Sequence, residues 1–189
     1  MTVKIERKTK ETKVSVELSL GGGQADIEIS CGFLSHMLEL FAFHAGVGLK
    51  VQASGDERVD YHHLAEDVGI LLGRAFLQAG SERPVKRYGW CAIPMDGSLV
   101  LAAVDVSGRG QFEWKGEFPV ERCGDFDLEL VPEFWKAFCR EGKITFHAQA
   151  LACDNAHHLA EALFKGAGRA FREAFSPAEA LQSTKGTLV

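Results

Sequence analysis

The sequence lacks the features of a membrane, secreted or nucleic-acid-binding protein. No apolar run approaches the roughly 20 residues of a transmembrane helix, and residues 1–12 contain no apolar core of a signal peptide. The five cysteines are odd in number and include no C-x-x-C pair, so we expect free thiols in a reducing compartment. A net charge of −5 gives no basic footprint for nucleic acid. We therefore expect a soluble, unprocessed, cytoplasmic protein that acts on a small molecule.

What the sequence does contain is an internal repeat. The pentapeptide HHLAE occupies residues 62–66 and returns at residues 157–161, 95 positions later. The tetrapeptide GRAF at 73–76 likewise returns at 168–171, so nine of the 15 residues counted from each first histidine are identical. Identity of this extent at one spacing indicates that a structural unit has been duplicated.

The hydrophobic pattern predicts a similar order of elements in the two halves. The first half is expected to contain strands at 14–20 and 27–29 joined by a hairpin at 21–23, a helix at 33–45, a strand at 47–54 and a helix at 62–79. The second half is expected to contain strands at 88–95 and 99–106 joined by the turn Asp96-Gly97, a helix at 130–139, a strand at 143–150 and a helix at 157–175.

Two ββ-α-β-α halves imply an α/β fold of the α+β sandwich type, in which antiparallel or mixed sheets carry helices on one face. One half-repeat spans residues 1–82 and the other spans residues 83–189. Neither is expected to be a free-standing domain, so the halves should form a single compact unit. Residues from about 176 to 189 are rich in serine, threonine and glycine, and we expect a flexible tail there.

The repeated motif places histidine and glutamate at a metal-binding spacing. Residues four apart share one face of a helix, so His62 with Glu66, and His157 with Glu161, can each offer an imidazole and a carboxylate to one metal. The second histidine of each pair points about 100° away and suits a different metal. One such pair alone would be read as a helix cap or a solvated turn, but two copies with glutamate at the same offset favour two metal sites that exchange ligands.

The ligand types limit the metal without fixing it. Imidazole suits zinc, iron and nickel, carboxylate also suits manganese, and the absence of cysteine ligands argues against a closed structural zinc site. A metal-bound imidazole usually donates its other N–H to an oxygen acceptor. Asp60, Asp67 and Asn155 are candidates for this second contact, although Asp60 fits a helix cap equally well.

Beyond these histidines the chain resembles the imidazoleglycerol-phosphate dehydratase family. The matching segments follow in the family's order over nearly the whole chain: GFLSHML at 32–38, DYHHLAED at 60–67, RYG at 87–89 with PMD at 94–96, DVSGR at 105–109, NAHHLAE at 155–161 and STKG at 183–186. The resemblance implies dehydration of imidazole-glycerol phosphate to imidazole-acetol phosphate in histidine biosynthesis, with two divalent metal ions, expected to be Mn2+, and no redox cofactor.

The resemblance also supplies ligands that the histidine pairs lack. It implies one metal bound by His36, His62, Glu66 and His158. It implies a second metal bound by His147, His63, His157 and Glu161. His44 is left without a ligand role, and we expect it to be structural.

The chemistry gives a reason for two metals. Hydroxide leaves the carbon beside the imidazole only if the ring supplies electrons, and a Lewis acid on each ring nitrogen would stabilise the imidazolate that does so. A base must then remove a proton from the adjacent carbon. Glu11, within RKTKET at 7–12, matches an active-site glutamate of the family and is the candidate acid/base, the alternative being a solvated strand residue. With the two ligand glutamates, the catalytic candidates are Glu11, Glu66 and Glu161.

The substrate's phosphate requires fixed cations, for which arginine offers a planar fork. The family's phosphate-contacting positions are matched by Arg87, Arg109, Lys165, Ser183 and Lys185. The resemblance further implies a homo-oligomer of 24 chains built from trimers, with active sites between subunits and no nucleic-acid or membrane partner.

Four positions depart from the family's pattern without removing a ligand: Ser35, Leu40, Tyr61 and Cys153. These departures alter the surroundings of the ligands. Two other functions therefore stay open, namely a dimetal enzyme that acts on another phosphorylated metabolite and a non-catalytic metal-binding paralogue.

Overall fold

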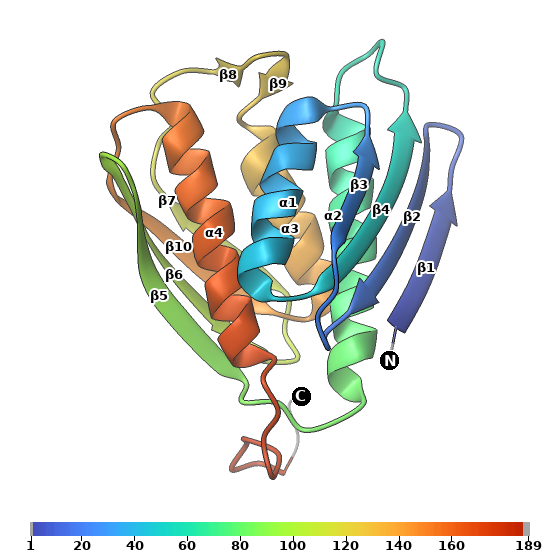
Figure 1. The fold of residues 1–189 in the computed structure, drawn as a ribbon, viewed down its shortest axis with the longest axis vertical. Coiled ribbons are helices and arrows are strands. Elements are labelled where there is room, and N and C mark those ends of the chain that lie inside the picture. Colours follow the sequence, from blue (N-terminus) through green and yellow to red (C-terminus); the bar gives the residue numbers. More distant parts are fainter. Residues whose placement is uncertain (1, 187–189) are drawn as a thin grey trace.

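Two four-stranded sheets enclose four helices in the computed structural model, which describes residues 2–186 (Figure 1). The elements of the first half are β1 (Thr2–Lys8), β2 (Thr12–Ser19), β3 (Ala25–Ile29), α1 (Gly32–Ala45), β4 (Gly48–Gly55) and α2 (His62–Ser81). Those of the second half are β5 (Tyr88–Met95), β6 (Ser98–Asp105), β7 (Gln111–Lys115), β8 (Arg122–Cys123), β9 (Phe126–Asp127), α3 (Leu130–Gly142), β10 (Thr145–Ala152) and α4 (Ala156–Ala174).

The two sheets have the same topology. The first has the order β1-β2-β4-β3 and the second the order β5-β6-β10-β7. In each sheet three strands are antiparallel and the last strand is parallel to its neighbour, β3 to β4 and β7 to β10. A short β8–β9 hairpin precedes α3. The predicted α/β architecture with antiparallel and mixed sheets is therefore confirmed.

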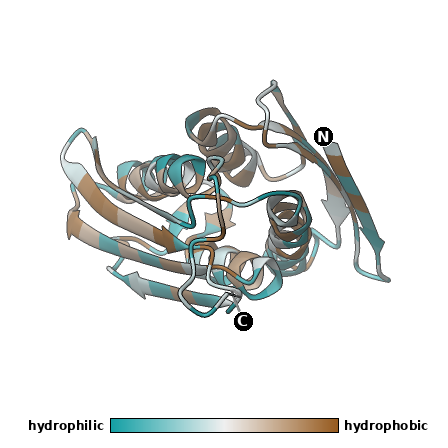
Figure 2. Cartoon of the chain, turned by 90° about the horizontal axis from the view of Figure 1, so that it is seen from below, coloured by the Kyte–Doolittle hydropathy of each residue, from teal (hydrophilic) through white to brown (hydrophobic). Residues whose placement is uncertain are grey.

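The helices fill the space between the sheets, so each sheet carries helices on one face (Figure 2). Helix α2 packs on the first sheet and on α3, while α4 packs on the second sheet and on α1. An aromatic cluster joins all four helices, with ring centroids 5.2 to 6.1 Å apart: Phe41, Phe76, Trp135, Phe138 and Phe171. These are ordinary packing distances for aromatic pairs. The two halves thus share one core.

The outer faces of the two sheets differ in chemistry. On the first sheet, Lys4 is exposed and pairs with the carboxylates of Glu6 and Glu17. On the second sheet, Trp90 and His147 are exposed in the same cross-strand row, since both lie opposite Ala103. One outer face is therefore charged, whereas the other combines apolar side chains with a predicted metal ligand.

Most predicted elements are confirmed, including all four helices and the hairpin at Asp96-Gly97. Helix α1 ends as expected at Gly46, which adopts a left-handed conformation with φ of 66°. The predicted hairpin at 21–23 is wrong, because β2 pairs with β1 and β4 while β3 lies parallel to β4. Alternating hydrophobicity identifies the buried face of a strand but not its neighbour. Strand β1 was not predicted, because the exposed face of Thr2–Lys8 is charged and little of the segment is apolar. Strand β7 was also not predicted.

Helices α1 and α3 each lie in the connection between two parallel strands, β3 and β4 or β7 and β10. A helix that connects two parallel strands runs antiparallel to them, and Figure 1 shows the helices starting at the same end of the molecule. His62 is the first residue of α2 and His157 the second residue of α4, so both repeated motifs lie at this end. Within residues 2–186, no helix is long and apolar enough to cross a membrane.

Candidate metal centre

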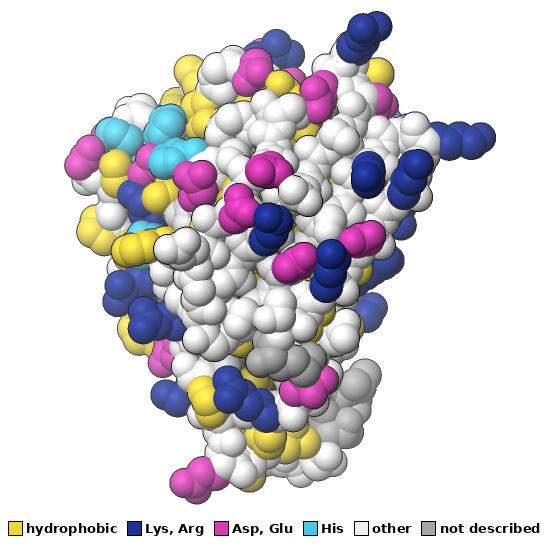
Figure 3. All heavy atoms as spheres, turned by 45° about the vertical axis from the view of Figure 1, so that its right-hand side comes forward, with side chains coloured by type: hydrophobic (Ala, Val, Ile, Leu, Met, Phe, Trp, Pro, Cys, Tyr) yellow, Lys and Arg dark blue, Asp and Glu magenta, His cyan; other side chains and the backbone are white. Residues whose placement is uncertain are grey.

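One group of metal-ligand side chains is assembled at the end where the helices begin. His36 of α1 and His157 of α4 each place Nε2 3.1 Å from Oε1 of Glu161. Within residues 2–186 this is the one set of three such side chains whose ligand atoms all lie within 4.8 Å of one another. Figure 3 shows histidine side chains gathered beside acidic ones near this end. Neighbouring ligands about 3 Å apart suit a divalent ion with bonds of about 2.1 Å in octahedral geometry.

Glu161 is the buried member of this group, with 8% of its surface exposed. Its Oε2 accepts a hydrogen bond from Nζ of Lys165 at 2.6 Å. Burial raises the pKa of Glu161, but hydrogen bonds from Lys165, His36 and His157 outweigh burial and lower the pKa to about 2. The carboxylate is therefore ionised at neutral pH. Lys165, predicted as a phosphate contact, lies directly against a predicted metal ligand.

The second histidine of each repeated motif faces a carboxylate. His158 Nδ1 lies 2.9 Å from Asp154 Oδ2, and His63 Nδ1 lies 3.0 Å from Asp56 Oδ2. An ionised carboxylate only accepts hydrogen bonds, so each contact to it requires a hydrogen on Nδ1, and that tautomer leaves a lone pair on Nε2 for a metal. These hydrogen bonds also raise the pKa of both histidines. Nδ1 of His158 also lies 2.7 Å from the side-chain amide nitrogen of Asn155. Asp56 and Asp154 were missed, although each precedes its histidine by no more than seven residues.

The remaining predicted ligands do not join the group. His62 begins α2, and its ring centroid is 6.0 Å from that of His63. Glu66 accepts a hydrogen bond from Nη2 of Arg140 at 3.3 Å. His147 lies on β10, on the outer face of the second sheet. These side chains would need a partner from outside the group to complete a metal site.

Within one chain, His36 contacts two residues that the prediction assigns to the other metal, and the predicted grouping, with its site between subunits, stays a prediction. The prediction assigned His36 to the same metal as His62 and Glu66, whereas the structure places His36 against His157 and Glu161. The reason is that α1 packs on α4 rather than on α2. The sequence repeat contains no information about which helices are neighbours.

Two of the residues predicted to accept a hydrogen bond from a metal-bound imidazole lie at the histidine motifs. Asn155 caps α4, because its Oδ1 accepts the backbone N–H of His158 at 2.8 Å. Asp60 accepts the backbone N–H of His62 at 2.7 Å, which is the capping role rather than a contact to an imidazole. Both residues thus fix the first turn that presents the histidines.

Asp67 has a different role from the one predicted. It is buried, Nε of Arg7 lies 2.9 Å from its Oδ1, and Thr12 donates a hydrogen bond to its Oδ2. Asp67 therefore ties the β1–β2 hairpin to α2 and orients no histidine.

Glu11, the candidate acid/base, lies in the turn between β1 and β2. Its side chain is 56% exposed, and its Oε2 is 3.9 Å from Nδ1 of His63. The alternative, a solvated strand residue without a catalytic role, is wrong only about the strand, since β1 ends and β2 begins on either side of Glu11. The position places an exposed carboxylate beside the first histidine motif.

Two predicted phosphate contacts meet at one carboxylate. Arg87 donates to both oxygens of Asp105, at 2.7 and 3.2 Å, and Nη2 of Arg109 lies 4.0 Å from Asp105. Arg87 has a φ of 73°, a conformation that is uncommon for residues other than glycine. Its Nη1 also donates to the carbonyl of Gln182 at 2.8 Å, so this arginine holds the C-terminal segment.

The last described residues contain the other phosphate candidates. The backbone N–H of Lys86 donates to the carbonyl of Ser176 at 2.8 Å, which fixes the start of the predicted tail. Ser183 accepts the backbone N–H of Lys185 at 3.2 Å. Residues 187–189 of the predicted tail lie outside the described residues. Ser183 and Lys185 thus follow closely on Gln182, the residue whose carbonyl Arg87 holds.

The departures from the family's pattern leave the group around Glu161 intact. Tyr61 donates its hydroxyl to Asp125 at 2.9 Å, and this hydrogen bond raises the pKa of Tyr61 to about 12. Ser35 donates to the carbonyl of Ile27 at 3.4 Å. Leu40 packs against the hydrophobic core, and Cys153 is exposed. None of these contacts competes with a ligand atom of the group.

His44 lies near the end of α1, away from the ligand group. Burial, followed by the positive charges of Lys165 and Arg169, lowers its pKa. An imidazole with a lowered pKa is neutral at pH 7. His44 therefore adds a hydrogen-bonding group, and not a charge, to a surface that already carries these two cations.

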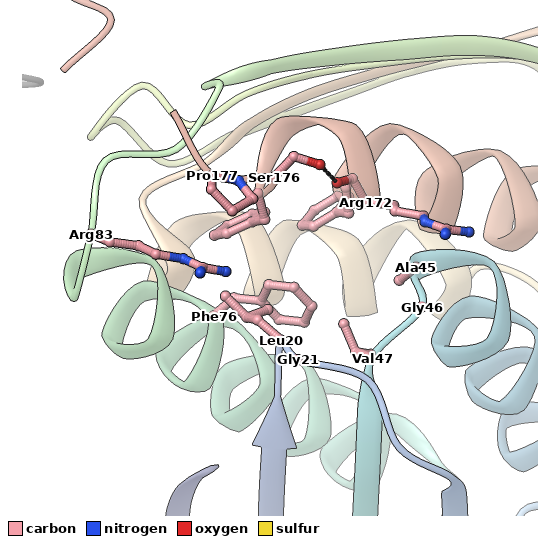
Figure 4. A pocket seen from close by; sticks show the side chains of 12 residues that line it. Leu20, Gly21, Ala45, Gly46, Val47, Phe76, Arg83, Arg172, Ser176 and Pro177 are labelled. Atoms are coloured by element: carbon pink, nitrogen blue, oxygen red, sulfur yellow. Dashed lines mark hydrogen bonds between the residues drawn. The ribbon is translucent and has the colours of Figure 1, made fainter. Parts of the chain in front are cut away.

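A cavity of about 260 Å³ lies at the other end of the helices (Figure 4). It is lined by Phe76, Phe171 and Phe175, with Arg83 and Arg172 at its edges. No predicted site residue lines it. Positive side chains at the C-terminal ends of helices offset the partial negative charge of the free carbonyls, which accounts for the two arginines.

Known proteins that are similar to this chain in sequence include members of one family. The sequence model of the imidazoleglycerol-phosphate dehydratase family matches residues 30–171. An imidazoleglycerol-phosphate dehydratase of Jannaschia sp. (strain CCS1) is 47% identical over 193 residues, covering 99% of each chain. That of Azorhizobium caulinodans is 48% identical over 190 residues, covering 97% of this chain and 96% of the relative.

Solved structures agree with the sequence comparison. The crystal structure of imidazoleglycerol-phosphate dehydratase from Staphylococcus aureus has a TM-score of 0.86 at 35% identity, covering 94% of this chain and all of that one. The Pyrococcus furiosus structure, a complex with (S)-C348, has a TM-score of 0.86 at 38% identity and covers 96% of this chain and 99% of that one.

Proposed function

Because the chain belongs to the imidazoleglycerol-phosphate dehydratase family, a family of hydro-lyases in histidine biosynthesis, we propose that it converts imidazole-glycerol phosphate to imidazole-acetol phosphate and water. The observation that carries the proposal is the group of His36, His157 and Glu161 with Lys165 beside it. Two imidazoles and a carboxylate suit a divalent ion, and the adjacent ammonium suits an anionic substrate.

The donor set is the ground for proposing two divalent metals, Mn2+ by the family resemblance. His36, His157 and Glu161 would hold one ion, since their ligand atoms are already spaced as neighbouring ligands are. His63 and His158 each keep an Nε2 lone pair for a site completed by other chains. When bound, the ions would supply Lewis acidity to the nitrogens of the substrate's imidazole, so that the ring can release hydroxide from the neighbouring carbon.

The chain's own residues would divide the remaining work. Glu11, exposed beside His63, is proposed to move the proton of the adjacent carbon. Lys165 keeps Glu161 ionised and turns its Oε1 toward the two histidines. Glu66 is proposed as a ligand of the second ion, for which it must exchange its hydrogen bond with Arg140.

The predicted phosphate-binding arginines lie far from the metal-ligand group at Glu161, which supports a site built from more than one chain. Met95 contacts Lys165 through its sulfur, and β5 runs from there to Arg87. Eight residues of extended strand span about 25 Å, which is much longer than a substrate of one imidazole ring, three carbons and a phosphate. We therefore propose that the arginines of one chain bind the phosphate of a substrate held by the histidines of another.

The proposed assembly is the homo-oligomer of 24 chains that the resemblance implies. The exposed face with Trp90 and His147 supports contact between copies through the second sheet. Because metals would join ligands from different chains, removing them should loosen the particle. We expect sedimentation velocity to show a large species with Mn2+ and a smaller one in chelator. An identical sedimentation profile in both conditions would contradict metal-linked assembly.

Product identification tests the proposed reaction. The Mn2+-loaded protein, supplied with imidazole-glycerol phosphate, should yield imidazole-acetol phosphate with its phosphate still attached. Release of inorganic phosphate would instead indicate a dimetal hydrolase. Bound metal without turnover would indicate a non-catalytic paralogue.

A further inference from the structure

The carboxylate of Asp154, in the loop between β10 and α4, is held by four hydrogen-bond donors. Oδ1 accepts from the hydroxyl of Ser98 at 2.6 Å and from the backbone N–H of Asn155 at 2.8 Å. Oδ2 accepts from the backbone N–H of Gly97 at 3.3 Å and from Nδ1 of His158 at 2.9 Å. Three of the four donors belong to the backbone or to a side chain that is 1% exposed. The carboxylate is therefore fixed before it meets the imidazole.

The turn between β5 and β6 is built to approach this carboxylate closely. A Cβ at Gly97 would lie 2.7 Å from Cβ of Asp154, a distance that real Cβ atoms do not adopt. Asp96, the preceding residue, has a φ of 48°, so the turn bends sharply at this contact. Ser98 returns a second bond by accepting the backbone N–H of Asp154 at 3.2 Å. The turn and the loop thus form one docked unit, although 56 residues separate Ser98 from Asp154.

We propose that Ser98, Gly97 and Asp154 form a positioning unit for His158, which aims its Nε2 at a metal ion. The unit touches neither metal nor substrate. Two groups face Nδ1 of His158: the carboxylate of Asp154 at 2.9 Å and the side-chain amide nitrogen of Asn155 at 2.7 Å. The ionised carboxylate favours the hydrogen on Nδ1, which leaves the lone pair on Nε2, and the turn fixes the direction of the ring by fixing Asp154. The inference rests on the proposed function, because it assigns the supporting contacts of one of its metal ligands.

The first repeated motif provides an internal contrast. His63 meets Asp56 in the same way, but among the described residues the Asp56 side chain has no hydrogen-bond partner other than His63. An anchored carboxylate holds an imidazole more firmly than one that is free to rotate. Of these two histidines, His158 is accordingly the one whose orientation is set by the fold.

The test measures the Mn2+ affinity of the intact protein by competition with a chelator, together with the Mn2+ electron paramagnetic resonance spectrum. Asp154→Ala should weaken binding about 10- to 100-fold, the usual effect of removing a carboxylate behind a metal-bound histidine. Asp154→Asn, which keeps an acceptor oxygen, should recover part of the loss. Ser98→Ala should weaken binding less than Asp154→Ala. The variant that combines Ser98→Ala with Asp154→Ala should bind no worse than Asp154→Ala alone, since Ser98 acts through Asp154.

A matched control is Ser30→Ala, which removes another serine hydroxyl bonded to a carboxylate, that of Glu57. It should leave affinity and spectrum unchanged. Unchanged affinity and spectrum in Asp154→Ala and Ser98→Ala, in a protein that binds Mn2+ and turns over before substitution, would overturn the positioning unit alone. Failure of the unsubstituted protein to bind Mn2+ would overturn the proposed function and this inference together.

Discussion

Glu161→Gln should abolish turnover and empty the metal site at His36 and His157. Glutamine has nearly the same shape, but its neutral amide is a poor ligand for a hard divalent ion and cannot offset the charge of Lys165. The ammonium of Lys165, whose side chain is 16% exposed, would keep a positive charge close to the place of the ion. We expect activity to fall by more than about 100-fold, which is the upper range for losing a mere supporting contact.

The measurement is turnover together with metal content per chain. Glu17→Gln is a suitable control, because Glu17 pairs with Lys4 on the charged outer face of the first sheet and should leave both quantities unchanged. Full metal content and normal turnover in Glu161→Gln would show that the group around Glu161 is not the metal site.

Gly73→Ala should prevent stable folding. Gly73 lies where α2 crosses α3, and a Cβ there would be 2.2 Å from the carbonyl oxygen of Phe138 and 2.8 Å from the backbone nitrogen of Gly142. Both neighbours are backbone atoms, so the overlap is relieved only by moving the helices apart and opening the aromatic core. Overpacked cores usually lose about 1 to 3 kcal/mol, and displacement of a whole helix should exceed that range.

Thermal unfolding of the metal-free and metal-loaded protein checks this expectation. Gly32→Ala is the matched control, because Gly32 begins α1 and a Cβ there would meet nothing within 4 Å. That variant should unfold at the temperature of the unsubstituted protein or slightly above, since alanine favours helix over glycine. A Gly73→Ala protein with the same unfolding temperature would mean that α2 and α3 are not packed as described.

Local features of the fold followed from the sequence, and long-range pairing did not. The apolar spacing in α2 and α4 and the Asp96-Gly97 turn each depend on neighbouring residues, and each was predicted correctly. The partner of β2 depends on which strands arrive beside it, and the predicted hairpin with β3 was wrong. Strand β1 shows too little apolar surface to be recognised without its partner.

The candidate site divides in the same way. The i,i+4 pair of His157 and Glu161 could be derived from helix geometry alone, and the structure brings the two side chains together. The placement of His36 depends on α1 packing against α4, which no periodicity records, so its contact with Glu161 was not predicted. Asp154 stands four residues before His158, but its importance comes from the distant turn at Ser98.

The most direct test of the central claim is a titration of metal-free protein with Mn2+ in the presence of imidazole-glycerol phosphate. Turnover should be absent without metal and should rise until two equivalents per chain are bound, and His157→Ala should show no such rise. Full turnover in excess chelator, or a maximum that does not depend on His157, would contradict a dehydratase that works through metals held by the repeated histidine motifs.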